Sequence, residues 1–384
     1  MQKKHFILLN VKRIVFLFIL ILVMFVNTGL VEAFASTPRT SSTNTQTENR
    51  EENNRSNSGS ASGEAMSGVF RPVAVVVSNA LGALPQHGIS QADIIYETLV
   101  EGGITRKLAI FNDITGVGTL GSIRSARPYF IDIAESHDAI FVHGGGSPLA
   151  ISILQSRNSC HIDGVFGPGL SAFYREPQRI QIHSLFTSGA RISQTVNSLG
   201  IRPTHREGFR PSLEFTGNAA PVTQTNESQS TSGSGRISSA TTSGVIEAPR
   251  GSGRADEISV RFSASNTTVF RYDINDNLYY VSHHNNQRYT DGNNDMQVAV
   301  SNIIILKTSV SGIPGDGAGR LNIVTTGSGT GYFANGGSFT EIRWSRSGSS
   351  AQFEYSLLDG TPLMLGFGTT YICIVPTDAR IRIN

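Results

Sequence analysis

Only two of the 384 residues are cysteine, and only 16% are charged. Two cysteines cannot supply a disulfide scaffold or a multi-cysteine zinc site, although Cys160 and Cys373 could either bridge or stay isolated. The formal net charge of +2 lacks the basic excess of general nucleic-acid binders, so we expect no nucleic-acid partner. The hydrophobic content of 39% is low for a chain that folds throughout. Part of the chain is therefore expected not to be globular.

Residues 1–35 have the pattern of a signal peptide or an N-terminal anchor. Basic residues precede an apolar run over 14–26, which is shorter than the about 20 residues of an ordinary membrane span. Residues 33–35 then offer a small-x-small cleavage pattern. Both interpretations place the rest of the chain outside the cytoplasm, secreted or anchored at the outer face of the cell membrane. We expect the chain to contact the membrane only through this N-terminal segment, and only if the segment is not cleaved.

Two polar stretches divide the rest of the chain. Residues 36–68 predict a disordered tether and residues 206–254 a low-complexity linker, because neither can bury enough apolar surface to offset its ordering entropy. They leave two folded blocks, an N-terminal block at 69–205 and a C-terminal block at 255–384.

The N-terminal block alternates strand and helix signals, which predicts an α/β or α+β domain. Its expected strands lie at 72–77, 92–96, 107–112 and 139–143, and its expected helices at 125–136 and 148–155. The C-terminal block has no convincing helix, and short apolar runs separated by turn sequences predict an all-β domain. Its expected strands lie at 258–263, 269–273, 277–282, 298–307, 319–325, 329–335, 338–345, 351–357 and 370–375.

Several segments carry a family resemblance. The N-terminal block contains RPVAVVVSN, ADIIYETLVEGGITR, GSIRSARPYF and HGGGSP, and the C-terminal block contains TGYFANGGSFTEIRWSR and DGTPLMLGFGTTYICIVP. Together they resemble the YerB-like lipoprotein family, whose two parts are domains of unknown function. The resemblance implies an extracytoplasmic protein of a bacterial envelope and brings no established activity. No acylatable cysteine follows the signal segment here, so the anchor must differ, and His183-Ser184 stands where relatives have a His-Asn pair.

The densest functional signal is SIRSARPY at 122–129. If Ser125 caps the helix expected there, Arg124 and Arg127 flank a helix N-terminus, whose free N–H groups and partial positive charge attract anions. Two guanidiniums would add bidentate recognition of phosphate or carboxylate. The alternative is that both arginines pair with nearby carboxylates and staple the domain. The carboxylates considered are Glu97, Glu101 and Asp132.

A glycine loop is the second candidate. His143, Gly144, Gly145, Gly146 and Ser147 lie between an expected strand and an expected helix, where glycines let the backbone approach a ligand closely. The loop superficially matches the HGGG oxyanion segment of esterases, but the chain has no G-x-S-x-G nucleophile elbow, which argues against serine hydrolysis. The alternative is a tight turn with a structural His143.

Further candidates are carboxylates and one basic residue. EGGITR could bring Glu101 and Arg106 to the same region, and Glu97 and Glu101 would share one face if this stretch were helical. Such a pair could do acid–base work, although surface charge is the commoner reason for it. His183 is a secondary candidate through the family resemblance.

A second, partial resemblance is to the LytR-CpsA-Psr phosphotransferases. It rests on Asp93 within ADII, the Ser-Ile-Arg step at 122–124 and the downstream glycine loop. This resemblance implies Asp93 as a magnesium ligand or base, with Arg106, Arg124 and Arg127 clamping phosphates.

The sequence favours a non-enzymatic envelope protein that binds an anionic envelope ligand or another envelope protein through the arginine and glycine segments. We assign no catalytic residue, no metal site and no cofactor. The competing interpretation is a metal-dependent phosphotransferase or hydrolase acting on envelope glycopolymer precursors.

Overall fold

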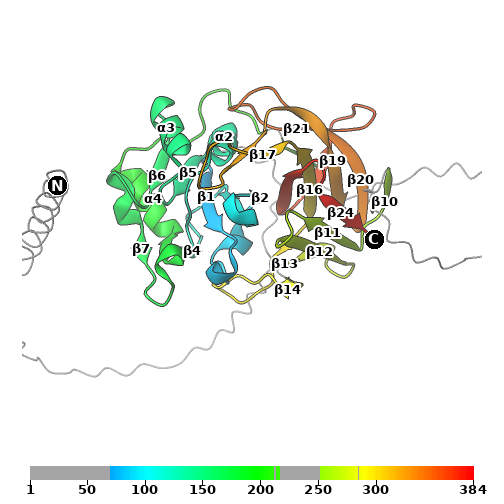
Figure 1. Ribbon diagram of the computed structural model, residues 1–384, viewed down its shortest axis with the longest axis horizontal. Coiled ribbons are helices and arrows are strands. Elements are labelled where there is room, and N and C mark those ends of the chain that lie inside the picture. The colour runs from blue at the N-terminus through cyan, green and yellow to red at the C-terminus, as the bar shows by residue number, and fades with distance from the viewer. Residues whose placement is uncertain (1–69, 212, 217–250, 284) are drawn as a thin grey trace, which may run out of the picture. The chain divides into compact units, whose positions relative to one another are not determined.

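The computed structural model describes residues 70–211, 213–216, 251–283 and 285–384 (Figure 1). The predicted signal or anchor segment, the tether and most of the predicted linker lie outside the described residues, so those predictions stay predictions. No helix in the described part of the chain is long and apolar enough to cross a membrane.

The N-terminal block has three α-helices and a mixed sheet, as the fold-class prediction expected. Its strands are β1 (Val73–Ser78), β2 (Ile94–Leu99), β3 (Thr105–Phe111), β4 (Thr119–Gly121), β5 (Ile140–His143), β6 (His161–Asp163), β7 (Tyr174–Arg175) and β8 (Leu185–Ser188). Its helices are α2 (Pro128–Ser136), α3 (Pro148–Ser156) and α4 (Gly189–Ser198). Short 3-10 helices are η1 (Leu81–Ala83), η2 (Ile89–Gln91), η3 (Glu101–Gly103), η4 (Pro168–Ala172) and η5 (Gln181–His183).

Local sequence explains where the helices begin. Ser147 caps α3 and Ser188 caps α4, each accepting a hydrogen bond from a backbone N–H three residues on. The prediction that Ser125 caps α2 is wrong, because the helix starts at Pro128 and Arg127 is its cap residue. The pyrrolidine ring of a proline disfavours helical geometry in the residue before it, and Arg127 is accordingly extended, with φ −132° and ψ 153°.

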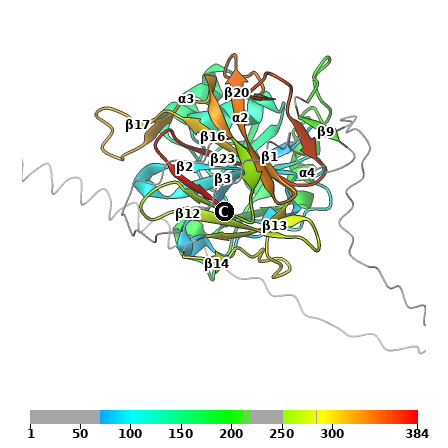
Figure 2. The same ribbon diagram turned by 90° about the vertical axis from the view of Figure 1, so that its right-hand side faces the viewer.

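The C-terminal block is built of strands, and its described residues contain no helix, which confirms the all-β prediction. Its strands are β10 (Ser252–Arg254), β11 (Glu257–Arg261), β12 (Thr267–Asp273), β13 (Leu278–His283), β14 (Gln287–Arg288), β15 (Ala299–Val300), β16 (Asn302–Thr308), β17 (Val310–Gly312), β18 (Leu321–Ile323), β19 (Gly327–Asn335), β20 (Ser338–Arg346), β21 (Glu354–Leu357), β22 (Met364–Gly366), β23 (Thr370–Pro376) and β24 (Arg380–Ile383). Figure 2 shows the β12–β13 hairpin below β16 and β23.

The predicted linker contains short ordered segments. Strand β9 (Glu214–Thr216) pairs in parallel with β22, and β10 pairs with β20. The ring of Phe215 stacks on that of Phe367, with centroids 6.3 Å apart. An aromatic residue thus gives this polar stretch an apolar contact with the C-terminal block.

One sheet runs through both blocks. It has 11 strands, in the order β10-β20-β19-β16-β23-β2-β3-β1-β5-β6, with β21 paired to β20 (Figure 1). The junction is a parallel pairing of β2 with β23, from Ile94 opposite Thr370 to Thr98 opposite Ile374. A second sheet of the C-terminal block, ordered β14-β13-β12-β11-β24, packs on it, and Phe270 of β12 contacts Tyr371 of β23 edge to face.

Strand direction decides which loops meet. β3 is antiparallel to both β1 and β2, while β1, β5 and β6 are parallel neighbours. The carboxyl ends of β1, β2, β5 and β6 therefore lie at one edge of the sheet, together with the start of β3. In open α/β sheets this edge is where ligands bind.

Candidate functional site

The arginine segment and the glycine loop lie side by side at this carboxyl edge. The Ala126 N–H donates to the Gly145 carbonyl oxygen at 2.9 Å, and the Gly144 N–H donates to the Arg124 carbonyl oxygen at 3.0 Å. Arg106, at the start of β3, donates to the Ser125 carbonyl oxygen at 3.1 Å. The fold thus brings together the two segments that the sequence singled out.

Three guanidiniums, of Arg106, Arg124 and Arg127, form what we call the arginine cluster. The Glu101 carboxylate pairs with two of them: Arg106 Nη2 lies 3.0 Å from Oε1, and Arg127 binds both oxygens through Nε and Nη2. Arg124 Nη1 donates to the carbonyl oxygen of Ile182. Among the described residues, Glu101 is the carboxylate that pairs with this cluster, so the cluster carries an excess of positive charge.

Burial and mutual repulsion shift the pKa values of the groups in this cluster. Burial and the neighbouring Arg127 together lower the pKa of Arg106 to about 10, while Glu101 opposes the shift. Burial also lowers the pKa of Arg124. Burial would raise the pKa of Glu101, but Arg106 and Arg127 hold it below its usual value. An added anion would relieve this repulsion.

The three arginines of the cluster differ in exposure to solvent. Arg106 is 2% exposed and Arg127 6%, whereas Arg124 is only partly buried. Of the two arginines in the stapling alternative, Arg127 pairs with Glu101, as Arg106 also does, whereas Arg124 donates to a backbone carbonyl oxygen and has no carboxylate partner among the described residues. His183 is buried beside Arg124, and burial, Arg124 and Arg179 lower its pKa.

The backbone N–H groups of Gly145 and Ser147 and the Ser147 hydroxyl in the glycine loop form hydrogen bonds within the protein. The Gly145 N–H donates to Asp163 Oδ1 at 2.7 Å, and the Ser147 N–H donates to the Ala126 carbonyl oxygen at 3.2 Å. The Ser147 hydroxyl accepts the Ala150 N–H at the start of α3. Gly145 needs its glycine because φ is +67°. The loop therefore shapes the site, and these donors are engaged within the protein.

The His143 ring is held on both sides. Nδ1 lies 2.8 Å from the Gly145 carbonyl oxygen and Nε2 lies 3.0 Å from His161 Nδ1, and the side chain is fully buried. Burial lowers the pKa of His143 to about 4, against the opposing influence of Asp163. These contacts fit the alternative of a tight turn with a structural His143.

We expect His143 to make folding acid-sensitive. Its native pKa lies below the ordinary histidine value, so between about pH 6.5 and pH 4 the unfolded state binds more protons and stability falls as pH falls. Between pH 7 and pH 4.5, His143→Gln should lose less unfolding free energy than the wild type does. We expect the two losses, measured by urea unfolding, to differ by about 1–3 kcal/mol. Equal acid sensitivity of the two proteins would contradict this assignment.

The carboxylate pair expected from a helical spacing does not form. Glu97 lies on β2 and is buried on the C-terminal block, where Tyr371 Oη and Thr268 Oγ1 donate to its Oε2 at 2.6 and 2.9 Å. Glu101 lies in η3 after the strand, at the arginine cluster. The condition for that pairing, a helix over this stretch, is not met, because β-branched and aromatic neighbours favour an extended strand at 94–99.

Asp93 lies away from the arginines. It precedes β2, whereas Glu101 follows it, and its carboxylate accepts the Asn112 N–H at 2.7 Å at the end of β3. Six strand residues separate the two positions, a span of about 20 Å. The arrangement implied by the phosphotransferase resemblance, with Asp93 beside the arginines, is therefore absent from this fold.

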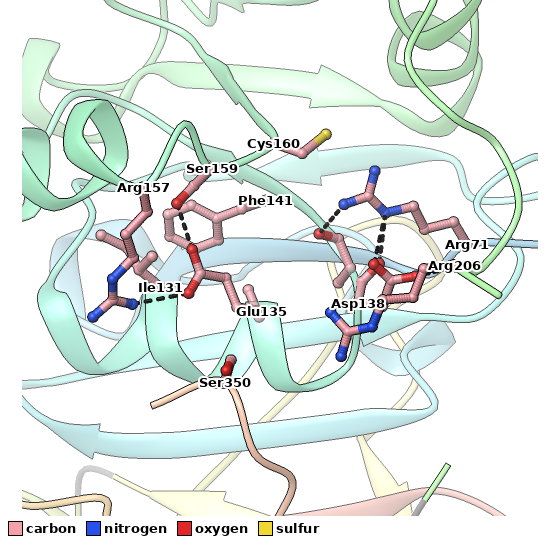
Figure 3. A pocket seen from close by; sticks show the side chains of 12 residues that line it. Arg71, Ile131, Glu135, Asp138, Phe141, Arg157, Ser159, Cys160, Arg206 and Ser350 are labelled. Atoms are coloured by element: carbon pink, nitrogen blue, oxygen red, sulfur yellow. Dashed lines mark hydrogen bonds and ion pairs between the residues drawn. The ribbon is translucent and has the colours of Figure 1, made fainter. Parts of the chain in front are cut away.

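A pocket of about 270 Å³ lies at the opposite edge of the N-terminal block (Figure 3). Four of its charged groups form ion pairs: Arg71 Nε lies 3.7 Å from Asp138 Oδ1, and Arg157 Nη1 lies 2.8 Å from Glu135 Oε2. The residues that line it are Arg71, Ile131, Ala134, Glu135, Asp138, Ala139, Phe141, Arg157, Ser159, Cys160, Arg206 and Ser350. Sequence reasoning missed this pocket because its lining comes from distant segments without a shared motif.

Neither cysteine bridges: Cys160 at this pocket and Cys373 in β23 are both free thiols. Within the described ranges, no group of three His, Cys, Asp or Glu side chains could hold a metal ion.

Comparisons with known proteins match both blocks. Residues 58–202 match "Protein of unknown function (DUF3048) N-terminal domain" and residues 258–372 match the corresponding C-terminal domain. The chain is 32% identical over 306 residues to "Putative lipoprotein YerB" of Bacillus subtilis strain 168, covering 80% of this chain and 81% of the relative. The crystal structure of YerB protein from Bacillus subtilis superposes with a TM-score of 0.64 at 30% identity, covering 82% of this chain and 94% of that chain.

Proposed function

The chain belongs to the YerB-like family, which joins a DUF3048 N-terminal domain to a DUF3048 C-terminal domain, and we propose that it is an extracytoplasmic protein that binds an anionic envelope ligand at the arginine cluster. The observation that carries this proposal is a cluster of three guanidiniums with one paired carboxylate: Glu101 binds Arg106 and Arg127, while Arg124 donates to a backbone carbonyl oxygen. Buried charges are normally paired, so this excess is best balanced by an anion from outside.

Two observations support the location. The first 35 residues have the pattern of a signal peptide or anchor. The Bacillus relative is named "Putative lipoprotein YerB", and a lipoprotein is attached to a membrane by its lipid. We therefore place the function at the cell envelope.

Exposed apolar side chains flank the arginine cluster and indicate the chemical class of its ligand. Ile180, directly before η5, and Ile182, within it, are 64% and 55% exposed, and Ile182 holds Arg124 through its carbonyl oxygen. Leu81 is 64% exposed beside Gly82, which packs against the His183 ring. A cationic site next to exposed aliphatic groups suits an amphiphilic anion, with a phosphate or carboxylate on an apolar carrier.

Replacing Arg124 with glutamine should weaken anion binding. A hydrogen bond from a charged donor contributes about 1.5–3 kcal/mol, so the Kd for pyrophosphate is expected to rise about 10- to 100-fold. Isothermal titration calorimetry without divalent metal measures this directly. Arg124 is chosen because it makes no ion pair with Glu101, so its loss should leave the fold intact.

Arg271 offers a matched control. It lies on β12 in the C-terminal block and pairs with Glu257 at the surface. Arg271→Gln should bind pyrophosphate as the wild type does. Equal affinity of the Arg124→Gln and Arg271→Gln proteins would remove Arg124 from the site, and no binding by the wild type would refute the proposal.

A further inference from the structure

Lys107 is a fully buried lysine in the middle of the shared sheet. The described residues contain two lysines, Lys107 and Lys307, and Lys107 is 0% exposed. It sits on β3, directly opposite Glu97 on β2 and diagonal to Asn79, which follows β1. Three adjacent strands thus place an amine, a carboxylate and a carboxamide on one face of the sheet.

The three groups are in hydrogen-bonding contact through the carboxamide. Lys107 Nζ lies 2.7 Å from Asn79 Oδ1, and Asn79 Nδ2 donates to Glu97 Oε1 at 2.8 Å. The carboxamide carbon is about 1.2 Å from its oxygen, so Nζ lies within about 4 Å of the carbon. This is close to the separation from which a nucleophile attacks a carbonyl.

The surroundings prepare both partners for reaction. Gln86 Nε2 donates to Asn79 Oδ1 at 3.2 Å, which would stabilise negative charge developing on that oxygen. The ring of Tyr289 covers Nζ, with its centroid 3.6 Å away. Burial lowers the pKa of Lys107 to about 8, against the opposing influence of Glu97, so a neutral amine is accessible near neutral pH. Only the neutral amine has the lone pair that attack requires.

We propose that Lys107 and Asn79 form an intramolecular isopeptide bond that ties β3 to the end of β1. Lys107 Nζ attacks Asn79 Cγ, the Nζ–Cγ bond forms and the Cγ–Nδ2 bond breaks. One proton passes from Nζ to Nδ2, with Glu97 Oε1 as the relay because it already holds Nδ2, and ammonia leaves. The exchange of one amide for another needs no oxidant, cofactor or second substrate.

The bond has a mass signature that a structural role for the same contacts would lack. The full chain is expressed, purified, denatured and digested with trypsin. Without the bond, cleavage after Arg106 and Lys107 releases 108–124 from a peptide that ends at Arg106 and carries Asn79. With the bond, trypsin cannot cleave after Lys107, so residues 107–124 stay joined to the Asn79 peptide. Their combined mass is then the sum of the two peptides minus one ammonia.

Fragmentation distinguishes the outcomes. A branched species with fragment ions from both peptides supports the proposal. Release of 108–124 together with an unmodified Asn79 peptide overturns it. Loss of ammonia from the Asn79 peptide alone, with 108–124 released, reports a cyclic imide at Asn79 and also overturns it.

Variants assign the reacting groups. Lys107→Arg keeps the charge but removes the amine nucleophile, and the branched species should disappear. Lys307→Arg is the matched control on β16 and should leave it unchanged. Glu97→Gln should lower the cross-linked fraction at least tenfold if Glu97 relays the proton. A branched species that persists in Lys107→Arg would refute the assignment.

Discussion

Replacing Glu97 with alanine is expected to lower the free energy of unfolding by about 3–5 kcal/mol, the range found when one partner of a buried charged network is removed. Glu97 is 1% exposed and accepts four hydrogen bonds. The donors are Asn79 Nδ2, Thr105 Oγ1, Thr268 Oγ1 and Tyr371 Oη. Each would be left buried without its acceptor, at about 1–3 kcal/mol apiece before relaxation. Urea unfolding at pH 7 measures the loss.

Two further variants separate the causes of this loss. Thr268→Val removes one donor and keeps the side-chain shape, so it should cost about 1 kcal/mol. Adding Glu97→Ala to the Lys107→Arg protein, which cannot form the proposed cross-link, measures the free energy that the hydrogen bonds of Glu97 contribute. A loss below about 1 kcal/mol in that background would show that Glu97 does not hold the two blocks together.

The N-terminal block expressed alone, as residues 69–211, is expected not to form a stable monomer. Strand β2 would lose its pairing with β23 and become an exposed sheet edge. Its six residues, all buried in the intact chain, would then lie at that edge. Asp291 of the C-terminal block would also be missing, and it accepts the Gly88 and Ser90 N–H groups at 2.9 and 2.8 Å. Size-exclusion chromatography should show aggregates, and thermal scans should lack a cooperative transition.

Co-expression with residues 251–384 is the control for this experiment. If the shared sheet is what stabilises the block, the two pieces should co-purify as a one-to-one complex with a cooperative transition. A soluble, cooperatively folding N-terminal piece would contradict the view that the two blocks form one folding unit.

Apolar patterning was sufficient for much of the fold. The run at 72–77 became β1, and 107–112 fell on β3, because β-branched and apolar residues that are buried on both faces leave a continuous apolar run. The helix expected at 148–155 begins at Pro148, as the preference of proline for the first turn of a helix indicates. The chemistry that positions these elements is local, so it can be found in the sequence.

Helix boundaries without a strong local signal were less accessible. The helix predicted from Ser125 begins at Pro128, because the pre-proline conformation of Arg127 outweighed the capping preference of serine. Helix α4 was missed because its sequence, GARISQTVNS, is largely polar and its buried stripe is narrow, with Ile192 and Val196 as its large apolar members. Its other local signal was the capping Ser188.

The candidate site was only partly predictable. Arg124, Arg127 and the glycine loop were expected to meet, and topology places them at one edge. The role of Glu97 could not be foreseen, because its partners Thr268 and Tyr371 lie 171 and 274 positions away in the sequence. The same holds for Lys107, whose covering ring belongs to Tyr289 in the other block.

The most direct measurement of the central claim is a crystal structure of the chain grown with pyrophosphate. Binding at the arginine cluster predicts an anion within hydrogen-bonding distance of Arg124 and of Arg106 or Arg127, with Glu101 sharing or yielding its contacts. A cluster in which Arg106 and Arg127 stay on Glu101, and Arg124 on the Ile182 carbonyl, with no anion beside them at saturating pyrophosphate, would contradict it.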